Sequence, residues 1–166
     1  MKGRASFVNK CIHFVLRVKG GMGQSGAHKP CSDVSYPSGS LSMSSDELRL
    51  YAIVRKDLLD ALKRGKLSGQ TGHAFEGALL TAQVECPERA QGYLATQGRA
   101  KITKYAKNAA AIERIRTACD ELGLPCHLVV DEGRTVFPEP TLTAIGIGPV
   151  TRAELPAFID KLQLLD

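Results

Sequence analysis

From Leu48 onward the chain alternates between strand-like and helix-like segments, and this order constrains its fold more than any other feature. Apolar and β-branched runs predict strands at 48–54, 100–106, 126–130 and 142–147. Helical patterns occupy 65–84, 87–97 and 108–122 and resume near 151. The order strand, helix, helix, strand, helix, strand, strand, helix predicts an α/β fold: a single compact domain with a mixed four-stranded sheet and helices on both faces.

Capping residues mark two of these helices. Asn108 stands where an N-cap is needed before an apolar stripe in 109–122, and Gly123 is a typical helix stop. Thr151 and Glu154 have the spacing of a capping box, which predicts the start of the last helix there, or a few residues later because Pro156 falls within its first turns. Local sequence therefore specifies both ends of the helix at 108–122 and the approximate start of the last one.

Residues 1–46 differ in composition from the rest of the chain. They are basic, nearly free of acids and then rich in Gly, Ser and Pro, which predicts a disordered basic leader before a domain at 47–166. The leader partly resembles an organelle transit peptide, while Met43 is a plausible internal start if the assigned start is too far upstream. Its apolar stretch, 11–16, is too short to span a membrane. We therefore expect no membrane association and a cytoplasmic location, or a mitochondrial one if the leader is a transit peptide in a eukaryote.

The formal net charge of +5 does not by itself indicate a nucleic-acid partner. All of the excess lies in residues 1–42, because the remaining residues hold equal numbers of basic and acidic side chains. Two local basic clusters remain, and a solvated surface is the more frequent explanation of each one taken alone. The clusters consist of Arg55, Lys56, Lys63, Arg64 and Lys66, and of Arg99, Lys101, Lys104 and Lys107.

The cysteine content argues against a disulfide framework or a zinc ribbon. The chain has five cysteines, an odd number, and no C-x-x-C pair. A reducing compartment is the simplest interpretation. We expect Cys119 and Cys126 to be small buried hydrophobic residues.

The block from Gly65 to Ala74 contains three polar side chains on one helical face. Lys66, Gln70 and His73 stand at i, i+4 and i+7. Lys66 lies in the first turn, where a cation opposes the helix dipole unless an anion joins it. Singly, each residue has an ordinary surface or semi-buried role, so only the combination indicates a site.

Two glycines interrupt the same helix. Gly69 and Gly72 each lower helix stability by roughly 1 kcal/mol relative to alanine. Because they are three residues apart and share a face, we expect a neighbouring strand or helix to approach the backbone closely there.

The block that follows the strand 126–130 carries a second polar set. Asp131 can act as a base, orient Lys66 or His73, or simply form a turn. Arg134 can pair with Asp131 or with a phosphate, and Thr135 can donate its hydroxyl to a carbonyl oxygen or cap the turn. The strand end is where α/β folds commonly display working side chains.

In this order, the blocks resemble the type-2 peptidyl-tRNA hydrolase family, which is archaeal and eukaryotic and also occurs in some bacteria. The likeness spans residues 48–165. The family motifs G-K-x-x-x-Q-x-x-H-A, D-x-G-R-T and T-x-x-G-I-G-P are matched here by Gly65, Lys66, Gln70, His73 and Ala74, by Asp131, Gly133, Arg134 and Thr135, and by Thr143, Gly146, Ile147, Gly148 and Pro149.

The resemblance implies hydrolysis of the ester between a peptide, or an N-blocked aminoacyl group, and the 3'-terminal ribose of tRNA, which recycles the tRNA. It implies peptidyl-tRNA as the partner and neither a metal nor an organic cofactor; a homodimer is left open. We expect the catalytic residues to be Asp131, His73, Lys66, Gln70 and Thr135. We expect substrate-binding residues to be Arg134, Lys56, Lys63 and Arg64.

Some positions depart from the family pattern. Residues 58–64 are bulkier than the family's Gly-rich, Met-containing loop, Gly72 stands where serine is common, and the 138–140 loop is stiffer. The alternatives are a non-catalytic tRNA- or protein-binding relative and a hydrolase of another small ester or amide. Retention of all five expected catalytic residues favours catalysis.

Overall fold

The computed structural model describes residues 47–165, so the predicted leader lies outside the described residues. The sheet within the described residues has the strand order β2-β1-β4-β3. The strands are β1 (Arg49–Arg55), β2 (Lys101–Ala106), β3 (Cys126–Asp131) and β4 (Thr141–Val150). β1 and β2 are parallel, whereas β4 runs antiparallel to both β1 and β3. The predicted mixed four-stranded sheet is confirmed.

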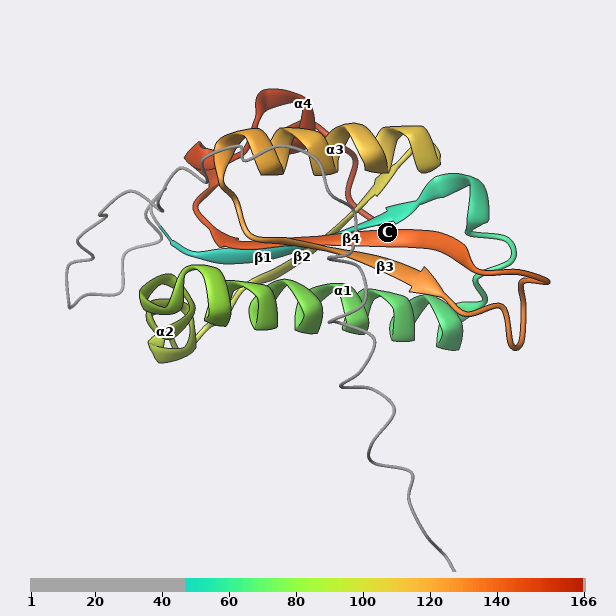
Figure 1. The fold of residues 1–166 in the computed structure, drawn as a ribbon, viewed down its shortest axis with the longest axis horizontal. Coiled ribbons are helices and arrows are strands. Elements are labelled where there is room, and N and C mark those ends of the chain that lie inside the picture. Colours follow the sequence, from blue (N-terminus) through green and yellow to red (C-terminus); the bar gives the residue numbers. More distant parts are fainter. Residues whose placement is uncertain (1–46, 166) are drawn as a thin grey trace, which may run out of the picture.

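Helices cover both faces of this sheet, as predicted (Figure 1). One face carries α1 (Arg64–Glu85) and α2 (Pro87–Ala95), and the other carries α3 (Ala109–Leu122) and α4 (Ala157–Asp160). Two short 3-10 turns, η1 (Lys56–Leu58) and η2 (Arg152–Glu154), follow β1 and β4.

The predicted caps form, but one begins a shorter element than expected. The Asn108 side chain accepts a hydrogen bond from the Ala111 N–H at 3.1 Å, and Gly123 ends α3 with φ 65°. Thr151 and Glu154 make their capping box on η2. The turn stops because Leu155 precedes a proline and is therefore extended, with ψ 133°.

Apolar clusters on both faces bind the helices to the sheet. On the α3 side, Ile112, Ile115 and Cys119 pack with Cys126 and other buried residues of the sheet. Both cysteines are buried and free, as expected. Leu122, assigned to the apolar stripe of α3, is 56% exposed because it lies at the helix end.

The α1 side of the sheet depends on small residues rather than large ones. Ala74 lies against β4 so closely that a Cβ at Gly146 would overlap the Ala74 carbonyl. Gly77 gives the same close approach to the ring of His127. The expectation for Gly69 and Gly72 was wrong: a Cβ there would meet nothing within 4 Å, because that side of α1 faces away from the sheet.

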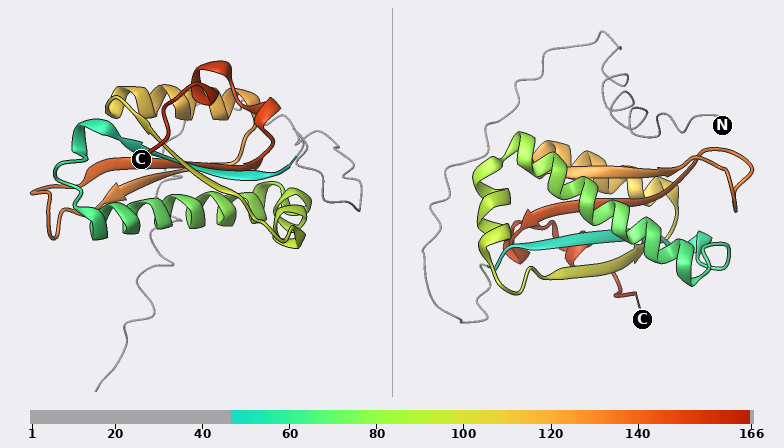
Figure 2. Two further views of the ribbon diagram at one scale, coloured as in Figure 1. Left: turned by 180° about the vertical axis from the view of Figure 1, so that it is seen from behind. Right: turned by 90° about the horizontal axis from the view of Figure 1, so that it is seen from below.

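The outer edge of β2 is covered by the C-terminal segment, residues 163–165, as the view from behind in Figure 2 shows. Tyr105 donates its N–H to the Gln163 carbonyl at 3.2 Å, and Leu165 donates to the Thr103 carbonyl at 3.0 Å. Lys104 is buried beneath the segment and donates to the carbonyls of Asp160 and Leu162. Lys104 is thus a structural residue and not part of a basic surface.

Candidate active site

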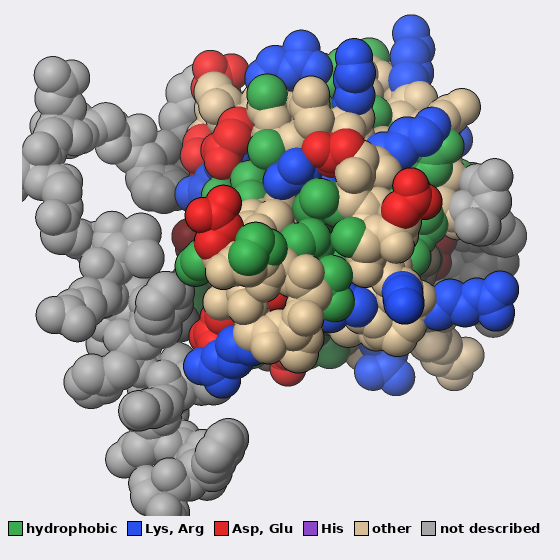
Figure 3. All heavy atoms as spheres, turned by 90° about the vertical axis from the view of Figure 1, so that its right-hand side faces the viewer, with side chains coloured by type: hydrophobic (Ala, Val, Ile, Leu, Met, Phe, Trp, Pro, Cys, Tyr) green, Lys and Arg blue, Asp and Glu red, His purple; other side chains and the backbone are tan. Residues whose placement is uncertain are grey.

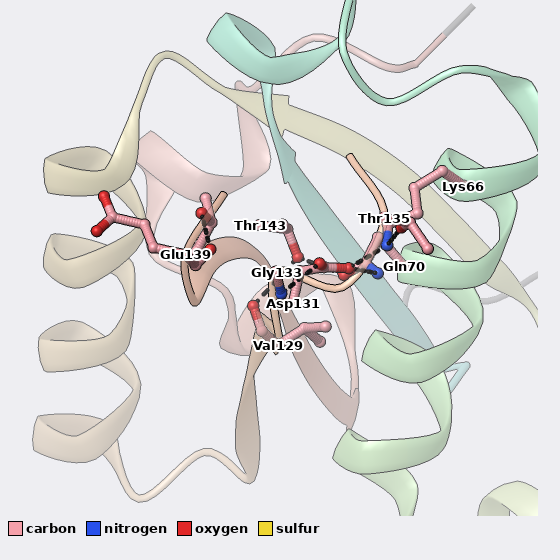
Figure 4. A network of polar contacts seen from close by, with 9 residues as sticks. Lys66, Gln70, Val129, Asp131, Gly133, Thr135, Glu139 and Thr143 are labelled. Atoms are coloured by element: carbon pink, nitrogen blue, oxygen red, sulfur yellow. Dashed lines mark hydrogen bonds and ion pairs between the residues drawn. The ribbon is translucent and has the colours of Figure 1, made fainter. Parts of the chain in front are cut away.

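A carboxylate and an ammonium group meet where the end of β3 faces the first turns of α1 (Figure 4). The Lys66 Nζ lies 2.5 Å from Asp131 Oδ2 and donates to Thr135 Oγ1 at 2.8 Å. Gln70, one turn further along α1, donates from Nε2 to the same Asp131 oxygen at 3.1 Å. The structure therefore brings together four of the five predicted catalytic residues.

Thr143 of β4 completes the network through the side chain of Gln70. Its fully buried hydroxyl lies 2.5 Å from Gln70 Oε1 and 3.2 Å from the Val129 carbonyl. Donation of the hydroxyl hydrogen to Oε1 fixes the orientation of the Gln70 amide, so that Nε2 faces Asp131. Thr143 belongs to the third sequence block but was not predicted as a site residue. The sequence signal that could have identified Thr143 is a polar residue within a buried, apolar strand, because such a residue needs a hydrogen-bond partner.

The loop after β3 holds the other carboxylate oxygen. The Gly133 N–H donates to Asp131 Oδ1 at 3.0 Å. Gly133 has φ 76°, and a Cβ there would lie 2.7 Å from the Glu139 carbonyl carbon, so the position requires glycine. Phe137 is buried in the core cluster on the α1 side and anchors this loop. The anchored loop presents Thr135 to Lys66.

Asp131 is 7% exposed and is nevertheless stabilised as a carboxylate. Burial by itself raises the pKa of Asp131, but hydrogen bonds from Lys66, Gly133 and Gln70 together with the charge of Lys66 outweigh it. The resulting pKa of Asp131 lies below its ordinary value. Asp131 is therefore ionised at neutral pH.

This arrangement offers complementary groups to a ligand. The carboxylate can accept a proton from a bound water, and the ammonium group can donate to a developing oxyanion. Thr135 is exposed and its oxygen accepts from Lys66, which leaves its hydroxyl hydrogen available to a ligand. These are the functions that ester hydrolysis requires.

His73 and Arg134, both predicted site residues, lie outside the network. The His73 side chain is exposed and makes no hydrogen bond or ion pair within residues 47–165. It lies near His127, whose pKa is lowered first by partial burial and then by the charges of Arg116 and His73. Arg134 does not pair with Asp131: its guanidinium lies 2.6 Å from Glu132, and both side chains are largely exposed. The turn at Gly133 directs Asp131 inward and Arg134 outward.

The other predicted basic residues lie on η1 and at the start of α1, at the same end of the molecule as the site. Figure 3 looks onto this end, the right-hand side of Figure 1, and shows Lys and Arg side chains projecting from several sides. Lys56, Lys63 and Arg64 are exposed there, and the Lys56 Nζ lies 4.6 Å from the Tyr105 ring centre. The bulky 58–64 segment buries Leu62 in the core, which leaves its basic residues outside.

Residues 47–165 contain no group of three or more His, Cys, Asp and Glu side chains placed to hold a metal ion. Within the same range, no helix has the length and apolar character needed to cross a membrane.

Comparison with known proteins identifies the family. The family described as peptidyl-tRNA hydrolase PTH2 matches residues 48–165. The chain belongs to this family. A peptidyl-tRNA hydrolase of Thermococcus onnurineus is 32% identical over 113 residues, covering 68% of this chain and 93% of the relative. One from Methanocaldococcus jannaschii is 30% identical over 118 residues, covering 71% and 100%, and one from Methanopyrus kandleri is 34% identical over 113 residues, covering 68% and 94%.

Membership of the peptidyl-tRNA hydrolase family confirms the resemblance found in the sequence. The matched region contains the whole described sheet and all the residues of the polar network.

Proposed function

We infer that this protein hydrolyses the ester bond between a peptide, or an N-blocked aminoacyl group, and the 3'-terminal ribose of tRNA, and so returns the tRNA for reuse. Its family and its relatives' names support this function. The observation that carries it is the buried Asp131 carboxylate, held by Lys66 and Gln70 beside the accessible Thr135 hydroxyl. Such a network suits hydrolysis of an ester that is already reactive.

We assign Asp131 the role of orienting a water and accepting its proton as the water attacks the ester carbonyl carbon. Lys66 and Thr135 then donate hydrogen bonds to the oxyanion that forms on the carbonyl oxygen. The bond between the carbonyl carbon and the ribose oxygen breaks, and the ribose oxygen takes up the proton from Asp131. The products are a peptide with a free carboxyl group and a tRNA with a free hydroxyl group.

Gln70 acts by positioning rather than by touching the substrate. Its amide is buried, donates to Asp131 and accepts from Thr143. Removing it would leave two buried polar groups without this partner, which is costly in the protein interior.

We assign tRNA phosphate contacts to Lys56, Lys63, Arg64 and Arg134. All four are exposed, and they lie on η1, at the start of α1 and in the loop after β3, at the end of the molecule that carries the site (Figure 1). Contacts of this kind release counterions, so kcat/KM should fall as salt concentration rises. His73 stays a predicted site residue, because it is exposed one turn beyond Gln70 on α1.

The non-catalytic alternative has less support than hydrolysis. A binding surface has no need of a buried carboxylate that is held in its charged form by three neighbouring residues.

A cytoplasmic or mitochondrial location and a homodimer remain predictions, and light scattering of the purified chain would determine the oligomeric state.

The test uses the full chain and N-acetyl-aminoacyl-tRNA, with release of free tRNA as the readout. Asp131→Asn should lower kcat by roughly 10²- to 10⁴-fold, the usual contribution of a positioned acid–base group. Glu132→Gln is the matched control, because that neighbouring carboxylate is exposed and pairs only with Arg134 within residues 47–165. Tight binding of tRNA by the parent without hydrolysis would instead support the non-catalytic alternative.

A further inference from the structure

One edge of the sheet is open beside the site. Within residues 47–165, β3 pairs with β4 on one side only, whereas the opposite edge strand, β2, is covered by residues 163–165. Alternate residues of β3 therefore direct their N–H and C=O groups away from the sheet. The right-hand view in Figure 2, seen from below, shows β3 as the outermost strand, with the loop after it extending from its end. An open edge of this kind is a template for another strand.

The open edge leads directly to the catalytic carboxylate. β3 is six residues long and ends at Asp131. Val130, the residue before Asp131, is 53% exposed and is free to contact a bound chain. A strand added to β3 would therefore have one end at the Lys66–Asp131 pair.

The chemistry of the substrate matches this edge. The peptidyl part of peptidyl-tRNA varies in sequence, so its recognition must rely on what all peptides share, the backbone. Strand addition supplies main-chain hydrogen bonds that do not depend on the side chains.

We propose that the peptidyl part of the substrate adds to the open edge of β3 as a parallel strand. The direction follows from the site: the esterified C-terminal residue must lie at Asp131, the C-terminal end of β3, so the peptide extends back toward Cys126. About six residues can pair before the edge ends. This proposal rests on the proposed function.

The first test varies the peptide on one tRNA. N-acetylated oligoalanyl-tRNAs of increasing length should show kcat/KM rising until the peptide matches the six residues of β3 and then levelling off. Single backbone N-methylation should lower kcat/KM at every second position, by roughly two- to tenfold for each lost hydrogen bond. Exchanging alanine for serine at the same positions is the control and should have little effect.

The second test measures hydrogen exchange of the parent chain with an amide-linked, hydrolysis-resistant peptidyl-tRNA. Amides of β3 that point away from β4 should exchange more slowly on binding, while those of β2 should not change. Hydrolysis that ignores peptide length and N-methylation, with unaltered exchange in β3, would overturn the strand proposal and leave the proposed function intact. Absence of hydrolysis of every ester would refute the proposed function, and exchange in β3 would still decide whether the peptide binds there.

Discussion

Replacing Thr143 by valine should lower the activity of the site, although Thr143 itself does not contact the substrate in this account. The Thr143 hydroxyl is fully buried and lies 2.5 Å from Gln70 Oε1. Valine has nearly the same shape but lacks the hydroxyl, so Gln70 Oε1 loses its donor. The amide of Gln70 is then free to rotate, and an oxygen turned toward Asp131 would repel the carboxylate that the nitrogen now holds at 3.1 Å.

The size of the effect follows from this one hydrogen bond. Leaving a buried acceptor without its partner costs about 1–3 kcal/mol. Thr143→Val should therefore lower the free energy of unfolding by about that amount. If the same free-energy cost applies in the transition state, kcat should fall by about five- to 150-fold, since each 1.36 kcal/mol is a factor of ten.

The assay is hydrolysis of N-acetyl-aminoacyl-tRNA, together with denaturant unfolding of the same preparations. Thr143→Ser is the matched control, because it retains the hydroxyl and loses only a methyl group. We expect the serine variant to keep most of the activity, with KM similar for all three proteins. Equal kcat for the parent and the valine variant would refute the positioning role of the Thr143–Gln70 pair.

Four further predictions concern glycines and pH. Gly72→Ala should raise the free energy of unfolding by roughly 1 kcal/mol, since a Cβ there meets nothing within 4 Å; Gly146→Ala, blocked by the Ala74 carbonyl, should instead lower the melting temperature. Gly133→Ala should reduce hydrolysis at least about tenfold, because φ 76° disfavours alanine and misplaces the Asp131 partner; unchanged turnover would contradict this. The lowered pKa of Asp131 stabilises the fold fully above the unfolded value of about 3.9, and this contribution disappears as pH falls through the folded pKa. The melting-temperature difference between the parent and Asp131→Asn should thus be constant down to about pH 4 and shrink below it.

Much of the fold could be predicted because its signals are local. Each strand is an apolar run, and Asn108 and Gly123 cap α3 by contacts within a few residues of themselves. Where two local signals compete, the prediction was less accurate. The capping box at Thr151 forms, but the proline after Leu155 confines it to a short turn.

The site was predictable where spacing determines position. Lys66 and Gln70 are one helical turn apart, and Asp131 ends a strand, so their convergence needed only that α1 pack across the end of β3. Thr143 was missed because its role depends on the register of β4 against β3, which no local pattern specifies.

The remaining differences arise from tertiary packing. Lys104 was assigned to a basic surface because the sequence gives no sign that the C-terminal segment covers β2. The glycines of α1 were misjudged for a similar reason: the sequence shows which residues share a helical face but not which face meets the sheet. Gly77 and Gly146, rather than Gly69 and Gly72, allow the close approach.

The most direct test of the account is a double-mutant cycle on the Lys66–Asp131 pair. Single-turnover hydrolysis of N-acetyl-aminoacyl-tRNA would be measured for the parent, Lys66→Met, Asp131→Asn and the double variant, with melting temperatures to confirm folding. Because the two groups act as one unit, we predict that the double variant is no slower than the slower single variant. Losses that multiply, or single variants as fast as the parent, would contradict the claim that this pair is the catalytic centre.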